Sequence, residues 1–470
     1  MRTRLCYLAL VLVPLFAYGP LLLQGYGTPE DYLRLAGGID DTQSGILHGA
    51  LTELAFFAVK GVGGLAWVRG LAVLFVILAG VALWQSLERG GWGELDALAV
   101  ALGTVLLPSA QLAASWASAW PAVLAALLSL AGFAAAESEL EAGGTRRSVG
   151  LLGGVLLYFA AAMCFLPNAI MALVPLAALT FSRPLRLVGE LGKWFRLHAF
   201  LMLLGIVGAW LVERWMMTDA GIADRTGLAE RLISLFSVAV SSSWALFLVG
   251  ETGAWRVAGA VLALGVLAGV IFAARRQVAA DARVQAAWLL ALLGSFALFA
   301  LVVVLAPHWH AGYRTIWPLA GVAVVAVAAA VRGVGDRPGK KPFWHYAALG
   351  GLVAAGGFAA ATQPLTHLAA PLADEWGALR GAVLRANFVG KSEVTLMVTP
   401  AADRVAVVEP HFQVRIADHA PAAQAMFALA LRERFPAGLP GGKDLPVRTV
   451  SARPEAAPER VVFDLTRSGN

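Results

Sequence analysis

Long apolar runs recur along the whole chain and constrain its fold more than any other feature. The hydrocarbon core of a bilayer is about 30 Å thick, and a helix needs roughly 20 apolar residues to cross it. Runs of this kind cover residues 5–24, 63–86, 95–113, 118–136, 197–217, 255–274, 285–306, 315–331 and 344–362. A longer run, 149–181, is interrupted at Pro167 and Asn168, so we expect two short helices there. The sequence therefore predicts an α-helical polytopic membrane protein with about eleven transmembrane helices.

The low share of charged residues excludes a soluble protein. The chain is 59% hydrophobic and only 14% charged, whereas soluble globular proteins carry about 25% charged residues. One very large buried core is excluded too, because single cores stop growing near about 250–300 residues. The two cysteines, Cys6 and Cys164, lie in apolar runs, so neither a disulfide framework nor a zinc site is expected. The 50 glycines are expected to allow close packing of helices in lipid.

The distribution of basic residues predicts the topology. Arg2 and Arg4 precede the first apolar run and no small-residue cleavage site follows it, so we expect an uncleaved span with a cytoplasmic N-terminus. Alternating sides then places these residues inside: Arg89, Arg146, Arg147, Arg183, Arg186, Lys193, Arg196, Arg275, Arg276, Arg283, Arg332, Arg337, Lys340 and Lys341. The opposite loops hold fewer: Arg34, Lys60, Arg214, Arg225, Arg231 and Arg314. The net charge of +6 thus indicates topology and not nucleic-acid binding.

Two apolar segments are not assigned as spans. Residues 226–250 are apolar enough to cross, but a crossing there would move Arg275 and Arg276 outside, against the charge bias. We expect this segment to be re-entrant or interfacial on the outer side, and we expect the same of residues 44–60, whose His48 would then be solvated. Apolar helices that lie at the interface suit a protein that handles a lipid.

The composition changes at about Gln363. Residues 372–386 have the pattern of an amphipathic helix, residues 392–400, 404–416 and 459–465 have that of strands, and a second helix is expected near 421–435. The sequence therefore predicts a transmembrane domain over residues 1–362 and a small extracytoplasmic α/β domain over residues 363–470. The odd number of spans places this second domain outside.

An acidic stretch follows the first span. It reads Gly-Thr-Pro-Glu-Asp-Tyr-Leu-Arg and ends at Arg34, and Asp40 and Asp41 come shortly after. The spacing of Glu30, Asp31 and Arg34 brings acid and base near one helical face. A carboxylate there can accept a proton from an attacking hydroxyl, as general-base catalysis requires. The alternative is a solvated acidic loop that caps a helix.

A second group of polar residues precedes a late span. His308, His310 and Arg314 lie in a short outer loop, and a guanidinium at an interface suits bidentate phosphate binding. The alternatives are snorkelling of Arg314 to lipid headgroups and interfacial packing of the histidines. Arg225 lies in another outer loop, with Asp219, Asp224, Glu230 and Arg231, where salt bridges are the alternative to a headgroup cavity.

We expect ionisable residues to be almost absent from the interior of the predicted spans. Arg69 and Arg256 lie near span ends. Proton-driven transporters normally carry an acid or a histidine inside the membrane. The sequence therefore argues against transport.

The order of these features resembles the membrane glycosyltransferases of the GT-C fold over roughly residues 1–360. Within that superfamily the chain is most similar to the phage-type serotype-converting glucosyltransferases and their bacterial relatives. Those proteins carry an Asp-Asp-x-x-Arg motif after the first span, which is matched by Glu30-Asp31-Tyr32-Leu33-Arg34. A Tyr-Arg-Thr-like start of a late span is matched by Tyr313-Arg314-Thr315. The chain departs from the family in having Glu30 at the first motif position and in lacking a downstream Gly-Arg pair.

This resemblance implies a polyprenyl-phosphate sugar as donor and a glycan, lipid or protein as acceptor. The expected place is the outer face of a bacterial cytoplasmic (inner) membrane, in cell-envelope chemistry such as O-antigen modification. Asp31 would be the catalytic base with Glu30 in support, and Arg314 would bind the donor phosphate, with Arg34, Arg225, His308 and His310 as further candidates. No cofactor and no resident metal site are expected, although help from a divalent metal stays open.

Two other functions are weighed against this one. An O-antigen polymerase or ligase usually has a large, arginine-rich outer loop late in the chain, whereas residues 307–314 form a short one. A transporter or flippase of a lipid-linked glycan would need buried charges along a path.

Overall fold

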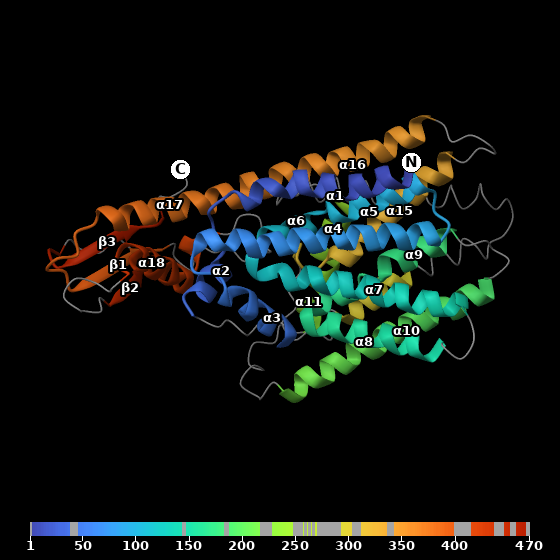
Figure 1. Ribbon diagram of the computed structural model, residues 1–470, viewed down its shortest axis with the longest axis horizontal. Coiled ribbons are helices and arrows are strands. Elements are labelled where there is room, and N and C mark those ends of the chain that lie inside the picture. The colour runs from blue at the N-terminus through green and yellow to red at the C-terminus, as the bar shows by residue number, and fades with distance from the viewer. Residues whose placement is uncertain are drawn as a thin grey trace.

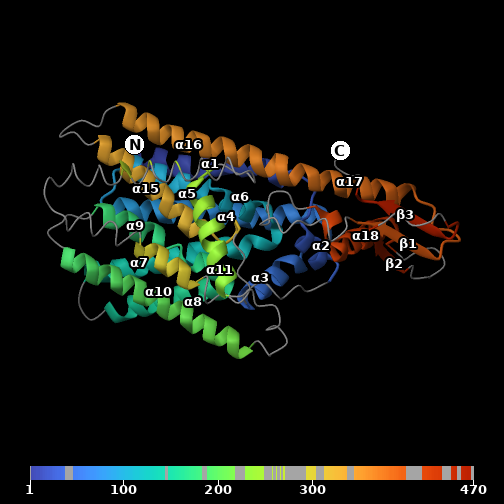
Figure 2. The ribbon, with the colours of Figure 1, turned by 180° about the vertical axis from the view of Figure 1, so that it is seen from behind.

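The apolar runs of the sequence form helices that lie side by side along the long axis of the molecule, as the computed structural model in Figure 1 shows. The structure describes residues 2–37, 46–142, 147–182, 188–216, 228–247, 257, 261, 265, 268–269, 293–302, 312–335, 343–398, 415–436, 446–451 and 457–466. The N-terminus lies at one end of the helix bundle, and the C-terminal strands lie beyond the other end (Figures 1 and 2).

Most of the predicted spans are present as helices. The bundle contains α1 (Arg2–Leu22), α4 (Leu65–Arg89), α5 (Glu94–Val105), α6 (Pro108–Ser115), α7 (Trp120–Ala142), α8 (Arg147–Phe165), α9 (Leu173–Ser182), α10 (Val188–Met216), α15 (Trp317–Gly335) and α16 (Phe343–Pro364). Within the described ranges, six helices are long and apolar enough to cross a membrane, and seven if the bent pair α5 and α6 is one span. Large apolar side chains such as Phe16, Trp215 and Phe358 face outward, at 74%, 85% and 74% exposure.

The chain is thus a multi-pass membrane protein, but the predicted count of about eleven spans is not confirmed. The predicted spans 255–274 and 285–306 fall largely outside the described residues, where only a few positions and the stretch 293–302 can be placed. The apolar part of α15, Trp317–Arg332, is shorter than an ordinary span.

Side-chain contacts show which helix ends lie together. At the N-terminal end, His345 at the start of α16 contacts Asp96 at the start of α5, with Nε2 and Oδ1 2.8 Å apart. At the opposite end, which we call the distal end, Arg69 in the first turns of α4 donates to the backbone carbonyl of Tyr26, which follows α1. The C-terminal strands lie beyond this distal end (Figure 1).

The predicted span 95–113 is bent rather than straight. α5 and α6 meet at an angle of 53°, and Pro108 at the first position of α6 has no N–H to continue the helical ladder. Carbonyls freed by such a bend need other donors inside a membrane. The indole of Trp317 donates to the carbonyl of Thr104, and the hydroxyl of Tyr18 donates to that of Val105. The bend is therefore fixed by side chains from α1 and α15.

The long apolar run 149–181 breaks at the place that Pro167 and Asn168 predict. α8 ends at Phe165, a 3₁₀ turn spans Leu166–Ile170, and α9 follows. The side-chain amide of Asn168 donates to the carbonyl of Ala122, and Ser129 donates to that of Ala169. The irregular backbone is thus paired with α7 in the interior of the bundle.

The two segments that were expected to lie at the interface are helical where they are described. α3 (Ile46–Phe57) is a helix of 12 residues at the distal end, with His48, Thr52 and Phe56 on its buried face. Leu54 and Phe57 are 71% and 92% exposed, so α3 presents large apolar side chains outward. Residues 226–250 form α11 (Leu228–Ser234), a π-helical stretch (Leu235–Val240) and α12 (Ser241–Trp244), and the rest of that segment lies outside the described residues.

The C-terminal part contains a small parallel sheet with two helices. A π-helical turn at Leu365–Ala369 joins α16 directly to α17 (Ala370–Arg385), and α18 (Ala420–Arg434) packs on α17. The strands β1 (Glu393–Met397), β2 (Val447–Val450) and β3 (Arg460–Asp464) are ordered β2-β1-β3, and both pairs are parallel. The predicted strand 404–416 lies almost entirely outside the described residues, and β2 was not predicted.

The expectation that ionisable groups are scarce within the spans is wrong. His345 and Asp96 lie within predicted spans and are 1% and 2% exposed on their side chains. Glu137 in α7 accepts from Trp194 at 2.7 Å and contacts His198 at 2.9 Å, both in α10. Each of these buried groups has a polar partner, as the cost of burying it requires. These pairs were missed because each joins residues that are far apart in the sequence.

Glycine was expected to allow close packing between helices, and Gly205 of α10 shows such packing against α8. A Cβ there would lie 2.7 Å from Cβ of Tyr158 and 2.8 Å from backbone atoms of Phe159 and Val155 in α8. Since backbone atoms cannot yield without separating the helices, Gly205→Ala should lower the free energy of unfolding by about 1–3 kcal/mol. Thermal unfolding in detergent measures this.

The matched control is Gly153→Ala in α8, where an added Cβ meets nothing within 4 Å. This control should be neutral or slightly stabilising, because alanine favours helix by up to about 1 kcal/mol over glycine. Equal unfolding temperatures for the two variants would show that α8 and α10 are not packed in this way.

Candidate active site at the distal end of the bundle

The acidic stretch after the first span forms a short helix with a capping box. α2 (Pro29–Leu35) has Thr28 as its N-cap and Pro29 at its first position. The Asp31 amide donates to the Thr28 hydroxyl at 3.4 Å, and the Thr28 amide donates to Oδ2 of Asp31 at 3.0 Å. This reciprocal pair is what the spacing Thr-x-x-Asp provides at a helix start. The capping alternative is therefore realised, but the helix is not solvated, because Thr28 and Asp31 are both fully buried.

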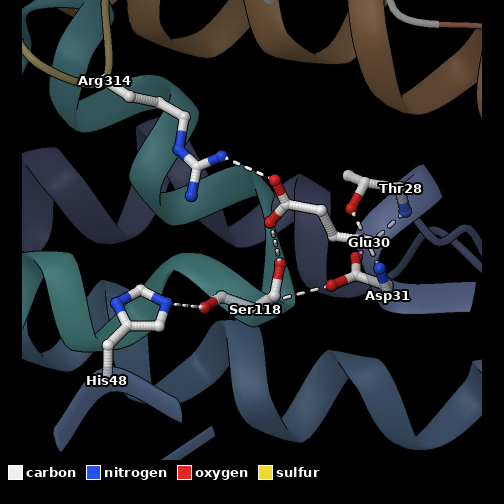
Figure 3. A network of polar contacts seen from close by, with 6 residues as sticks. All are labelled: Thr28, Glu30, Asp31, His48, Ser118 and Arg314. Carbon is white, nitrogen blue, oxygen red and sulfur yellow. Dashed lines mark hydrogen bonds and ion pairs between the residues drawn. The ribbon is translucent and has the colours of Figure 1, made fainter. Parts of the chain in front are cut away.

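Ser118 joins this helix to the bundle. It lies in a 3₁₀ turn (Ala117–Ala119) between α6 and α7. Its amide donates to Oδ1 of Asp31 at 2.8 Å, and its hydroxyl donates to Oε2 of Glu30 at 3.1 Å. Both oxygens of Asp31 thus accept backbone amides, and one serine holds two neighbouring carboxylates (Figure 3).

Glu30 pairs with Arg314 across nearly the whole sequence. Nη1 of Arg314 lies 2.9 Å from Oε1 of Glu30, and the two side chains are 16% and 29% exposed. The Arg314 guanidinium also lies 4.6 Å from the ring centroid of Trp116, within cation–π range. Figure 3 shows Glu30 between Arg314 and Ser118. Glu30, unlike Asp31, is therefore a carboxylate that solvent or a ligand can reach.

A tight turn presents Arg314. Thr315 donates its amide to the carbonyl of Gly312 at 3.0 Å, and its hydroxyl contacts the same residue, so residues 312–315 form a closed turn before α15. Arg314 therefore lies in this turn and not in α15, which begins at Trp317. From the turn its side chain reaches Glu30 of α2.

A second arginine supports the backbone before α2. Arg69 is fully buried and donates to the carbonyls of Tyr26 and Gln24 at 2.9 and 2.8 Å. Its guanidinium carbon lies 4.0 Å from the ring centroid of Tyr26. Arg69 thus fixes the chain that leads from α1 into Thr28.

The two carboxylates differ in their electrostatic surroundings. Burial opposes ionisation of Glu30, but the charge and hydrogen bond of Arg314, with the Ser118 hydroxyl, outweigh it and hold the pKa of Glu30 below its ordinary value. Burial raises the pKa of Asp31, although the amides of Thr28 and Ser118 and the charge of Arg69 oppose that rise. Because its pKa is lowered, Glu30 stabilises the fold above pH 4.5 and loses that contribution as the pH falls through its lowered pKa.

His48 also contacts Ser118, although it was expected to be solvated. It is 2% exposed, and its ring nitrogens lie 3.1 Å from the carbonyls of Cys164 and Ser118. Ser118 and His48 thus belong to the site, and sequence reasoning missed both roles. A cluster of serines in the apolar stretch 109–118 was the available signal for Ser118, and the i, i+4 spacing of His48 and Thr52 was the available signal for a buried polar face on α3.

The remaining predicted site residues are only partly placed. Arg34 lies in the last turn of α2, half-buried, and its charge acts on His48. Arg225, His308 and His310 lie outside the described residues, as do Asp40 and Asp41. Within the described ranges, no group of three or more His, Cys, Asp or Glu side chains is arranged to hold a metal ion.

The C-terminal part packs directly on the helix that carries the two carboxylates. α18 contacts α2, and the ring centroids of Tyr32 in α2 and Trp376 in α17 are 5.8 Å apart. α2 therefore lies between the bundle and the C-terminal part, as Figure 1 also shows.

Comparison with known proteins shows only distant similarity. No family model and no curated protein matches the chain. Among the solved structures that overlap with it is ArnT from Cupriavidus metallidurans bound to undecaprenyl phosphate, with 12% identity, a TM-score of 0.45, and coverage of 94% of this chain and 89% of that one. Another is the archaeal oligosaccharyltransferase AglB from Archaeoglobus fulgidus in complex with an inhibitory peptide and a dolichol-phosphate, with 12% identity, a TM-score of 0.42, and coverage of 88% and 65%. TM-scores below 0.5 do not establish a common fold.

The two carboxylates should differ in how much they stabilise the fold. Asp31→Asn leaves one acceptor oxygen for two buried amides, so it should lower the free energy of unfolding by about 1–3 kcal/mol. Glu30→Gln keeps an acceptor in a partly exposed pair and should cost less than about 1 kcal/mol. Thermal unfolding of the purified variants at neutral pH measures both, and a larger loss for Glu30→Gln would contradict this assignment of roles.

Proposed function

We propose that this chain is a glycosyltransferase of the GT-C type that moves a sugar from a polyprenyl-phosphate donor to a glycan or other acceptor. The reaction would take place at the outer face of the cytoplasmic membrane, where the distal end lies if the N-terminus is cytoplasmic. One observation carries the proposal: a partly exposed carboxylate, Glu30, meets a partly exposed guanidinium, Arg314, at one end of a membrane bundle. The resemblance of the motifs around Glu30 and Arg314 gives the donor class.

A lipid donor suits this position for a physical reason. Nucleotide sugars are cytoplasmic, so an outer transferase needs a donor that the membrane carries. A long isoprenoid gains about 0.8 kcal/mol per buried CH₂ group, which holds its phosphate at the interface. The outward apolar side chains of the bundle and of α3 offer the surroundings that such a chain requires.

Arg314 supplies the charge that a phosphate leaving group needs. A guanidinium has five N–H donors in a planar fork, and Glu30 accepts from only one nitrogen of Arg314. A donor phosphate at Arg314 would compete with the Glu30 carboxylate for the same cation. Since Arg314 lowers the pKa of Glu30, release from the ion pair would make Glu30 a better proton acceptor.

The transfer step then follows from these two groups. The acceptor hydroxyl oxygen attacks the anomeric carbon of the sugar, and its proton passes to the Glu30 carboxylate. The bond from that carbon to the phosphate oxygen breaks, and its electron pair stays on the lipid phosphate, where Arg314 stabilises the developing charge. We assign the base role to Glu30 and a positioning role to Asp31, because both oxygens of Asp31 accept backbone amides in a fully buried place.

One observation favours a different class of function. The buried pairs His345–Asp96 and His198–Glu137 are the kind of ionisable groups that a transporter or flippase of a lipid-linked glycan uses. Asp96 and His345 begin their helices at the N-terminal end, away from Glu30 and Arg314, so they do not extend the site along the bundle. An O-antigen polymerase or ligase would use the same distal end, and only the identity of the acceptor would distinguish it from the proposed glycosyltransferase.

The proposal predicts a specific loss of transfer. In membranes supplied with a radiolabelled polyprenyl-phosphate sugar and an acceptor extract, Glu30→Gln should lower the transfer rate about 10²–10⁴-fold, the usual contribution of a general base. Arg314→Gln should lower it about 10²–10³-fold, the usual loss for one group that stabilises a developing oxyanion.

Matched controls come from the exposed ion pair of Arg380 and Glu433 in the C-terminal part, whose side chains are 53% and 39% exposed. Arg380→Gln and Glu433→Gln should transfer at the wild-type rate. Wild-type transfer by Glu30→Gln at normal expression would remove Glu30 from the mechanism. Full transfer by a Glu137→Gln variant, together with the losses above, would argue against the transporter class.

A further inference from the structure

Two backbone carbonyl oxygens, which can only accept, face the two ring nitrogens of His48. Nδ1 lies 3.1 Å from the carbonyl oxygen of Cys164, and Nε2 lies 3.1 Å from that of Ser118. The side chain is 2% exposed and its ring lies 6.2 Å from that of Phe165, so solvent does not replace either partner. His48 therefore ties α3 both to the end of α8 and to the turn before α7.

The protonation state decides how many of these two contacts are hydrogen bonds. A carbonyl oxygen only accepts, and a neutral imidazole has one N–H and one lone pair. In the neutral ring, one nitrogen lone pair therefore faces a carbonyl lone pair at 3.1 Å. An imidazolium has two N–H groups and would donate to both carbonyls. The geometry fits the charged ring better than the neutral one.

The contact with Ser118 reaches the reactive carboxylates. The carbonyl oxygen of Ser118 faces the ring of His48. The amide of Ser118 donates to Asp31, and its hydroxyl donates to Glu30. A second firm hydrogen bond to the Ser118 carbonyl would restrain the turn that holds both acids. His48 forms no hydrogen bond to either acid, so its restraint on their positions runs through Ser118, while its charge and that of Glu30 act on each other directly.

Burial and the neighbouring positive charges work against the imidazolium. Burial, and next the positive charge of Arg314, lower the pKa of His48 to about 4, with Arg34 acting in the same direction and Glu30 and the Cys164 carbonyl opposing. Further charged groups on the elements around α3 are Asp31 of α2, Glu137 and Glu139 of α7, Glu53 on α3 itself and Glu213 of α10, which accepts from the amide of Ile46 at the start of α3. The imidazole is thus neutral at pH 7 while Arg314 has no anionic ligand other than Glu30.

We infer that His48 is a positioning residue of this site, which takes up a proton when a phosphate anion binds Arg314 and then fixes Ser118 through two hydrogen bonds. The inference rests on the proposed donor class. An anion on Arg314 cancels the cation that disfavours the imidazolium, while the two carbonyls and the Glu30 carboxylate favour it. Donor binding would then hold the Ser118 turn, and with it Asp31 and Glu30, in place before transfer.

The test measures proton uptake on ligand binding to the full-length protein in detergent. The probe is a polyprenyl methyl phosphate, a phosphodiester whose single charge does not change between pH 5.5 and 8. Titration calorimetry in two buffers of different ionisation enthalpy should show net proton uptake by the wild type at pH 6. The affinity should also rise by up to about twofold from pH 8 to pH 5.5 if the bound anion raises the pKa of His48 by about 1.5, because the burial that lowers this pKa most is unchanged.

Two variants separate this role from a merely structural one. His48→Gln keeps a donor but cannot be protonated, so its affinity for the probe should depend less on pH, and its proton uptake should be smaller, than in the wild type. His367→Gln, at an exposed position, should keep the wild-type slope. If the pH dependence and the proton uptake are unchanged in His48→Gln, the inference is overturned. It is also overturned if the wild type shows neither, and that measurement does not depend on the folding of any variant.

The outcome also distinguishes the two proposals. Binding of the probe without proton uptake would overturn the role of His48 and leave the donor assignment intact. No binding of the probe by the wild type at any pH would overturn the donor assignment and the inference together.

Discussion

The contact between Glu30 and Arg314 determines how the distal end of this molecule is built. Their ion pair offsets part of the cost of desolvating a charge at the edge of an apolar bundle. Their pairing joins α2, directly after the first span, to the turn before α15, with Oε1 and Nη1 2.9 Å apart. Ser118 adds a third segment, because its hydroxyl binds the second oxygen of Glu30. Three distant parts of the chain are thus held at one place by polar contacts that an apolar bundle alone could not specify.

Adjacent carboxylates have different roles because their environments differ. Asp31 completes a capping box and accepts a second amide from Ser118, so its lone pairs are used in holding α2 against the bundle. Glu30 directly precedes Asp31 in the same helix, and its side chain is partly exposed. The lowered pKa of Glu30 and the raised pKa of Asp31 reflect this difference, since an arginine faces one acid and burial dominates for the other. In the proposed mechanism, Asp31 thus fixes the helix that carries the reactive Glu30.

The sequence predicted the parts of the fold that depend on local pattern. Apolar length predicts α1, α4, α7 and α16, the break at Pro167 follows from a missing N–H, and alternating residues predict β1 and β3. The motifs also directed attention to Glu30 and Arg314. The pattern could not show that Ser118 holds both acids or that Asp96 and His198 find partners, because these contacts join residues between 61 and 249 positions apart. Hydropathy measures how apolar a helix is, but it does not tell which of its few polar atoms will meet those of another helix.

We propose that the site of Glu30 and Arg314 opens outside the cell, and labelling of single cysteines at the two ends of α4 tests this orientation most directly. Lys60, just before α4, and Arg89, at its end, are both exposed, while the native Cys6 and Cys164 are buried. A membrane-impermeant maleimide should label Lys60→Cys in intact cells and Arg89→Cys only after the cells are broken. The parent chain, which should stay unlabelled, is the control. Labelling of Arg89→Cys in intact cells, with Lys60→Cys protected, would place the site in the cytosol and contradict the account.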